Sequence, residues 1–95
     1  MTVYVLAQLK FTDRTAYNRY QACFMSVLRQ FTGRLLAADE HPQVLEGEWR
    51  RDKVVLLSFS DDTAFHLWSE SSEYQEILKD RKAGADAVVL LVRGI

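Results

Sequence analysis

The segment Glu46-Gly47-Glu48-Trp49 contains the residues of this chain that are best suited to acid–base chemistry. Alternate side chains of an extended segment point to the same side, so Glu46 and Glu48 share one side and Trp49 takes the other. Two carboxylates on one side repel each other and can raise a pKa, which makes Glu46 the first candidate for a general base. The simpler interpretation, which the sequence favours, is a solvated edge strand whose charges discourage sheet-to-sheet aggregation.

Aromatic residues recur at positions from which they could line a cavity between a sheet and its helices. Tyr and Trp each keep one polar atom, so such a cavity would suit a flat, partly polar ligand. A filled core is the favoured alternative, because aromatic stripes at helical spacing usually pack as core. The residues predicted to line the cavity are Tyr17, Tyr20, Trp49, Phe59, Trp68 and Tyr74.

The other reactive side chains do not have the spacing of a metal site or of a nucleophilic triad. His41 precedes Pro42 in a predicted turn, and His66 points away from the apolar stripe of its helix. Cys23 flanks the stripe of another helix and is predicted to be a small buried residue. The 4 glycines are scattered, so no phosphate-binding loop is expected. We predict neither a metal nor an organic cofactor.

These residues must be positioned by strands and helices, and the clearest of these is a strand predicted over Lys53–Phe59. Its residues from Val54 to Leu57 are apolar at consecutive positions. A strand that is covered on one face alternates polar and apolar residues, so this strand is predicted to be covered on both faces. Ala87–Val92, the last predicted strand, is apolar in the same way.

A first strand is predicted over Val3–Phe11, followed by a helix that Thr12-Asp13 can cap. Apolar residues at steps of three and four predict that this helix extends to about Phe31. Gly33 is predicted to end it in the left-handed conformation. Arg34–Ala38 is then a short second strand.

The second half of the chain repeats this pattern. Val44–Trp49 is predicted to be extended and to lead into the strand at residues 53–59. A helix begins near Asp61-Asp62 and breaks at Ser69–Ser72. Ser72 and Gln75 have the spacing of a capping box that starts the helix again.

Two strand–helix–strand halves with right-handed crossovers predict an α+β, ferredoxin-like βαββαβ fold with a four-stranded antiparallel sheet. No linker divides the chain, so residues 1–95 form one predicted domain. Helices on one face would leave an apolar patch on the other that is larger than monomers usually tolerate. We therefore predict a homodimer in which two sheets pack face to face as a dimeric α+β barrel.

The charge balance excludes several other classes of protein. The 12 Lys and Arg residues and 13 Asp and Glu residues are dispersed and give a net charge of −1, so no nucleic-acid partner is expected. No apolar run reaches the roughly 20 residues that span a bilayer. The first residues lack the features of a signal peptide, and the single cysteine suits a reducing compartment. We predict a cytoplasmic protein without membrane partners.

Four short motifs follow one another along the chain: Glu46-Gly47 with Trp49, Phe65 with Trp68, Ser72-Glu73-Tyr74, and Arg93-Gly94. The order of these motifs resembles the family called domain of unknown function 1330 (DUF1330). The resemblance implies the dimeric α+β barrel fold with a ligand cleft between sheet and helices. Relatives by fold include cofactor-free monooxygenases, isomerases and haem-dependent proteins, whereas the family itself has no settled activity. This chain has Arg50-Arg51-Asp52 and Ser71-Ser72 where the family usually places a proline.

Two hypotheses for the function follow. The first is a cofactor-independent enzyme, monooxygenase-like or isomerase-like, that abstracts a proton from a small aromatic or polyketide-like molecule. Glu46 would be its base, and Tyr17, Trp49 and Trp68 would be walls of its pocket. The second is a small-ligand-binding or stress-associated dimer without turnover, because no set of acid, base and nucleophile is assembled. An obligate dimer that serves only as an interaction partner is a third alternative.

Overall fold

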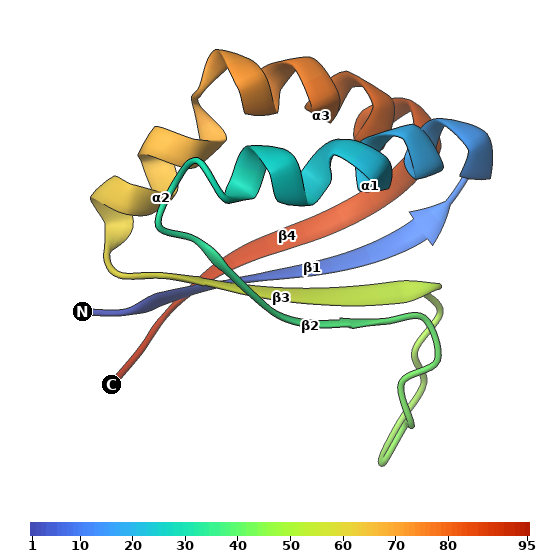
Figure 1. Cartoon of the computed structure of the whole chain (residues 1–95). Helices are drawn as coiled ribbons and strands as arrows, with labels where there is room; N and C mark the ends of the chain where they lie inside the picture. Colours follow the sequence, from blue (N-terminus) through green and yellow to red (C-terminus); the bar gives the residue numbers. More distant parts are fainter.

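The computed structural model covers all residues from Met1 to Ile95. Its four strands form one antiparallel sheet, and its three helices lie together on one face of that sheet (Figure 1). The predicted α+β, ferredoxin-like fold is therefore confirmed. The elements are β1 (Val3–Phe11), α1 (Arg14–Leu28), β2 (Arg34–Asp39), β3 (Lys53–Phe59), α2 (Asp62–Ser69), α3 (Ser72–Gly84) and β4 (Ala85–Arg93), and the strand order is β2-β3-β1-β4.

The pairing of β1 with β3 decides which side chains face the helices. Val5 lies opposite Leu57, and Leu9 lies opposite Lys53. Val5, Leu9 and Leu57 are almost completely buried under the helices. Because side chains two positions apart share a face of a strand, Lys53 also points toward the helices.

The first helix forms where its cap and its apolar stripe agree. The Asp13 carboxylate accepts hydrogen bonds from the backbone N–H groups of Thr15 and Ala16, as a capping residue does. The stripe of α1 is buried against the sheet and the other helices. It consists of Tyr17, Tyr20, Phe24, Val27 and Leu28.

The end of this helix differs from the prediction. The helix stops at Leu28 rather than near Phe31, and Gly33 is not in the left-handed conformation. A Cβ atom at Gly33 would lie 2.5 Å from both Leu28 Cδ1 and Phe59 Cε1. Glycine therefore allows the chain to pass close to the core, which is a steric requirement and not a conformational one.

The predicted capping box at Ser72 is also wrong by one residue. Ser71 is the N-cap of α3, and its Oγ accepts a hydrogen bond of 3.1 Å from the backbone N–H of Tyr74. The same hydroxyl donates to the carbonyl of Trp68 at 2.7 Å. Ser71 thus joins the end of α2 to the beginning of α3 and fixes the position of both aromatic residues.

Residues 40–52 form a long connection that projects from the sheet on the side away from the helices (Figure 1). The predicted extended segment Val44–Trp49 lies in it but pairs with no strand. Gly47 has a φ of 85°, the only positive φ in the chain, and turns the backbone there. The segment is therefore a protruding arm and not an edge strand.

The face of the sheet away from the helices is apolar. Val88, Leu90 and Val92 alternate with the helix-facing residues of β4 and are 40%, 45% and 47% exposed. Leu6 lies between Leu90 and Leu56 on the neighbouring strands and is half-buried. One chain by itself leaves this outer face open to solvent.

Candidate functional site

A cavity of about 540 Å³ lies between the sheet and the helices. Its floor is formed by helix-facing residues of β1 and β3, and its roof by side chains of α1 and α3. Most of its lining is apolar or aromatic, as is usual for small-molecule sites of about 300–1,000 Å³. Gln21 of α1 and Leu35 and Ala38 of β2 line it and are exposed, so they mark where it opens.

Four of the aromatic residues singled out in the sequence meet in this cavity: Tyr17, Tyr20, Trp68 and Tyr74. The hydroxyl groups of Tyr20 and Tyr74 are hydrogen-bonded at 3.0 Å in a buried position. The ring centroids of Trp68 and Tyr74 are 4.0 Å apart. Phe59 packs behind Trp68 at 5.3 Å and belongs to the core rather than to the lining.

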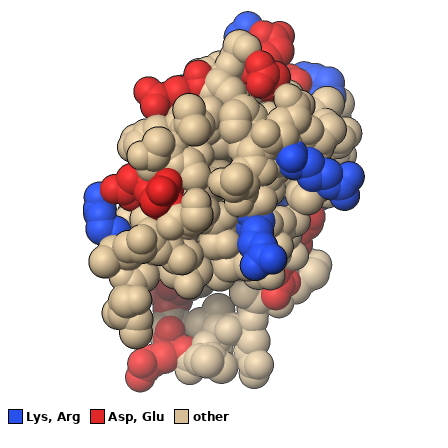
Figure 2. Space-filling model, turned by 60° about the vertical axis from the view of Figure 1, so that its left-hand side comes forward, with Lys and Arg blue, Asp and Glu red and all other residues tan.

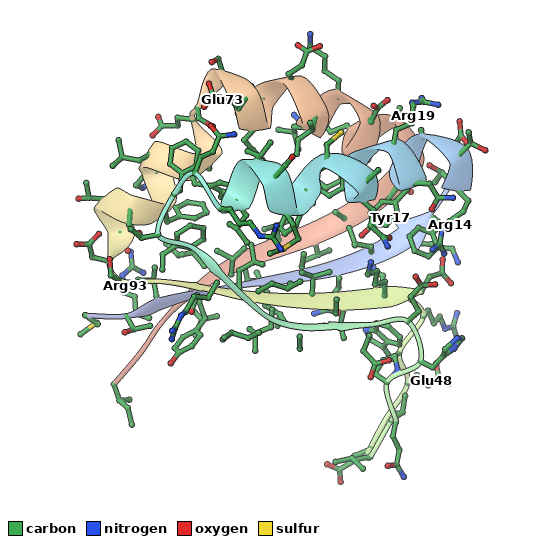
Figure 3. All side chains as sticks on the ribbon, in the orientation of Figure 1. Arg14, Tyr17, Arg19, Glu48, Glu73 and Arg93 are labelled. Atoms are coloured by element: carbon green, nitrogen blue, oxygen red, sulfur yellow. The ribbon has the colours of Figure 1, made fainter.

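The structure does not bring Glu46 and Trp49 to this cavity. The Trp49 indole N–H donates a 3.0 Å hydrogen bond to Gln8 Oε1, which lies on the outer face of the sheet. Glu46 is exposed on the projecting connection, and Figure 3 shows the nearby Glu48 on the opposite side of the sheet from Tyr17. A catalytic role for Glu46 stays a prediction that the cavity does not support.

Lys53 is the cavity residue that the sequence analysis missed. Its side chain is buried, with the residue only 5% exposed, and it lines the cavity. Its Nζ donates to Gln21 Oε1 at 3.2 Å and lies 5.0 Å from the centroid of the Tyr17 ring. Burial lowers the pKa of Lys53, and the charge of Glu40 opposes that shift.

The phenol groups of Tyr17 and Tyr20 stay protonated at neutral pH. Burial, assisted by the charge of Glu40, raises the pKa of Tyr17 to about 12. Burial also raises the pKa of Tyr20 well above its ordinary value, and the hydrogen bond with Tyr74 adds to this. Tyr17 and Tyr20 therefore face the cavity as neutral hydroxyl groups.

Arg81 of α3 is a second cationic residue of the cavity. It is half-buried, lines the cavity and forms no ion pair in the chain. Arg14, by contrast, donates two hydrogen bonds to Glu40 at 2.9 and 2.8 Å. Figure 3 shows Arg14 and Tyr17 next to each other at the same end of α1.

The remaining reactive residues lie outside the cavity. His66 is exposed as predicted, with Nδ1 3.5 Å from Glu70 Oε2, and His41 is an exposed residue after β2. Cys23 is exposed, so the prediction that it is buried is wrong, because it lies just beyond the edge of the buried stripe of α1. No three His, Cys, Asp or Glu residues gather in a metal-binding arrangement.

The charged side chains on one face of the molecule do not form a patch of a single sign. Figure 2 shows a face on which basic and acidic side chains are scattered instead of being gathered by sign. The helices of the chain are also too short or too polar to cross a bilayer.

Comparison with known proteins identifies the family. The family model described as domain of unknown function (DUF1330) matches residues 2–95. The chain belongs to the DUF1330 family. No curated protein matches the sequence of this DUF1330 member.

Solved structures share the DUF1330 fold at low sequence identity. A protein of unknown function from Rhodopseudomonas palustris superposes with a TM-score of 0.84 at 17% identity, over 99% of this chain and 82% of that one. A dimeric ferredoxin-like protein from Jannaschia has a TM-score of 0.74 at 15% identity, with 99% and 100% covered. SnoaB, a cofactor-independent oxygenase from Streptomyces nogalater, has a TM-score of 0.70 at 10% identity, with 99% and 93% covered. At these identities the likeness establishes the fold alone.

Proposed function

We propose that this DUF1330 chain is a subunit of a homodimer that binds a flat aromatic small molecule between its sheet and its helices. The observation that supports this most directly is the cavity of about 540 Å³ with Tyr17, Tyr20, Trp68 and Tyr74 in its lining. Such rings bind flat ligands through offset or edge-to-face contacts with ring centroids roughly 4.5–7 Å apart.

The homodimer part of the proposal rests on the outer face of the sheet. Exposed valine and leucine residues on that face would be buried by a second copy under a two-fold axis. Three structures with the same fold, including the Jannaschia protein, are described as dimeric. Dimer formation leaves the cavity of each subunit on the opposite side of its own sheet.

Binding is tested by the fluorescence of Trp68 with 2-naphthol, an aromatic probe that is neutral at pH 7. The variant Trp49→Phe removes the other tryptophan, so that quenching reports on the cavity. We expect saturable quenching that Ala7→Phe abolishes, because Ala7 lies in the cavity lining. Ala22→Phe, on the exposed surface of α1, is the matched control. Unsaturable quenching, or quenching that Ala7→Phe leaves intact, would refute the proposal.

A second candidate function is cofactor-independent oxygenation, which the fold shared with SnoaB favours. The enol form of a ligand such as anthrone would release its proton to solvent water, and the resulting enolate would react with molecular oxygen, the oxidant, to give the quinone, with water as the other product. Lys53 would stabilise that anion by its charge, as donors do in oxyanion sites. Oxygen uptake with anthrone as the probe tests this function. Binding of anthrone without oxygen uptake would leave the protein as a binding protein only.

A further inference from the structure

Three donor groups at one end of the cavity have no acidic partner in the chain. Lys53 Nζ donates only to the neutral amide of Gln21, at 3.2 Å. Arg81 forms no ion pair. The Tyr17 hydroxyl forms no hydrogen bond within the chain. Lys53 lies 5.0 Å from the Tyr17 ring centroid, and the charge of Arg81 acts on Tyr17 as well.

The nearest carboxylate does not serve as their counterion. Glu40 influences both Lys53 and Tyr17, but its two oxygens accept hydrogen bonds of 2.9 and 2.8 Å from Arg14. Glu70, the acidic residue in the cavity lining, belongs to the segment between α2 and α3 and lies 3.5 Å from His66. Neither carboxylate forms an ion pair with Lys53 or Arg81.

Buried cationic side chains without a neighbouring anionic group are unusual in proteins. Burying a charged group is unfavourable unless an opposite charge accompanies it, so buried cations are normally paired. Lys53 is 5% exposed and Arg81 is half-buried, yet both face the space in which a ligand would lie. An anionic group bound there would supply the missing charge and the missing hydrogen-bond acceptors.

We propose that the ligand is an anionic aromatic molecule whose carboxylate or phenolate group lies beside Tyr17, between Lys53 and Arg81. Its rings would lie against Tyr20, Trp68 and Tyr74 in the apolar part of the cavity. The Tyr17 hydroxyl would donate a hydrogen bond to the anion, and Lys53 would do so with a proton that Gln21 does not use. This inference rests on the proposed function and specifies its ligand.

The test compares two probes that share the naphthalene ring and differ in the group at position 2: 2-naphthoate, which carries a carboxylate at pH 7, and 2-naphthol, which is neutral. Hydrogen bonds to a charged group are stronger than those to a neutral one, so we expect 2-naphthoate to bind at least about tenfold more tightly than 2-naphthol. Lys53→Met and Arg81→Met should each remove most of that difference, whereas Lys53→Arg should retain it. Lys82→Met removes a positive charge from an exposed position next to Arg81 and serves as the control.

The outcomes separate this inference from the proposed function. Equal affinity for both probes, unchanged by Lys53→Met, would overturn the inference and leave the aromatic cavity intact. Tighter binding of 2-naphthylmethylamine, the cationic analogue, would overturn it as well. Binding of none of the probes would overturn the proposed function itself. Weakening of 2-naphthoate alone in Lys53→Met, with 2-naphthol unaffected, would support the inference directly.

Discussion

Tyr20 and Tyr74 join α1 to α3 through a hydrogen bond of 3.0 Å between their hydroxyl groups. Both side chains are buried, and their rings meet edge to face with centroids 6.2 Å apart. The bond satisfies two polar atoms that would otherwise be buried beside an apolar cavity. Each residue therefore depends on the other for its place in the roof of the cavity.

We expect Tyr20→Phe to lower the free energy of unfolding by about 1–3 kcal/mol, because the Tyr74 hydroxyl loses its partner. Replacing both residues by Phe should cost less than the sum of the two single changes, since no unpaired hydroxyl then remains. Urea unfolding of the four variants measures this coupling. Additive effects would show that the hydrogen bond does not contribute.

The free energy of unfolding should fall between pH 10 and 12, because Tyr17 keeps its proton to a higher pH in the folded chain than in the unfolded chain. Its pKa is about 12 when folded and 10.0 in the reference state, so the folded state binds more protons in this range. The contribution of Tyr17 is complete below pH 10 and decreases by up to about 1.4 kcal/mol per pH unit above it.

Urea unfolding at several pH values, compared with Tyr17→Phe, measures this slope. The variant should lose stability more gradually, although Tyr20 contributes in the same direction. Lys53 acts oppositely: because its folded pKa is lowered, its effect favours folding as the pH rises toward 10.5. Identical slopes in the two proteins would contradict the assigned role of Tyr17.

Lys53→Met should raise stability in the absence of a ligand. Lys53 is buried and forms no ion pair, so an apolar side chain of similar length removes the cost of burying its charge. We expect an increase in Tm at pH 7 that becomes smaller as the pH rises toward 10.5, because burial lowers the pKa of Lys53 and the folded chain loses this charge at a lower pH than the unfolded chain. Lys82→Met, at an exposed position, should leave Tm unchanged. A large decrease in Tm for Lys53→Met would show that the ammonium group stabilises the fold.

Gly84→Ala should destabilise the contact between α3 and the start of α1. A Cβ atom there would lie 2.4 Å from the backbone nitrogen of Tyr17, and the carbonyl of Gly84 accepts hydrogen bonds from Thr12 and Asp13. Backbone atoms cannot move aside cheaply, so we expect a loss of about 1–3 kcal/mol or more, measured by urea unfolding. Gly47→Asn, in open space at a positive φ that Asn tolerates, is a control that should change little.

Leu90→Lys should separate the proposed dimer. Leu90 lies on the outer face in the middle of the edge strand β4, opposite Leu6 in the pairing of β1 with β4. A lysine there would place a charge inside the proposed interface between the two sheets, where the cost of burying that charge opposes association. Light scattering should report a single chain for this variant and a dimer for Leu67→Lys, which changes an equally apolar residue on exposed α2. A wild-type protein that is already monomeric would contradict the proposed assembly.

The sequence predicts most of the fold because its local signals agree with one another. Asp13 and Asp61 cap helices where the sequence places them, and the apolar strand at residues 53–59 has the predicted bounds. Gly33 was mispredicted because its role depends on the approach of Leu28 and Phe59, which are distant from each other in the sequence.

The charged end of the cavity is harder to predict. Lys53 precedes an apolar run and resembles a charge at the end of a strand, and only its phase with Val55 and Leu57 places it inside. Trp49 was expected in the cavity, but the path of residues 40–52 carries it to Gln8 on the other face. That path depends on tertiary contacts and on one turn at Gly47, which hydropathy does not record.

The stacking of Trp68 on Tyr74, with ring centroids 4.0 Å apart, gives the molecule its own optical reporter. Two dissimilar chromophores held at a fixed tilt of 42° should produce a strong near-ultraviolet circular dichroism band. The band should vanish when side-chain packing loosens, even while the far-ultraviolet signal of the backbone persists. The same band can therefore report, without a label, whether a ligand has entered the cavity and whether the helices above it remain packed.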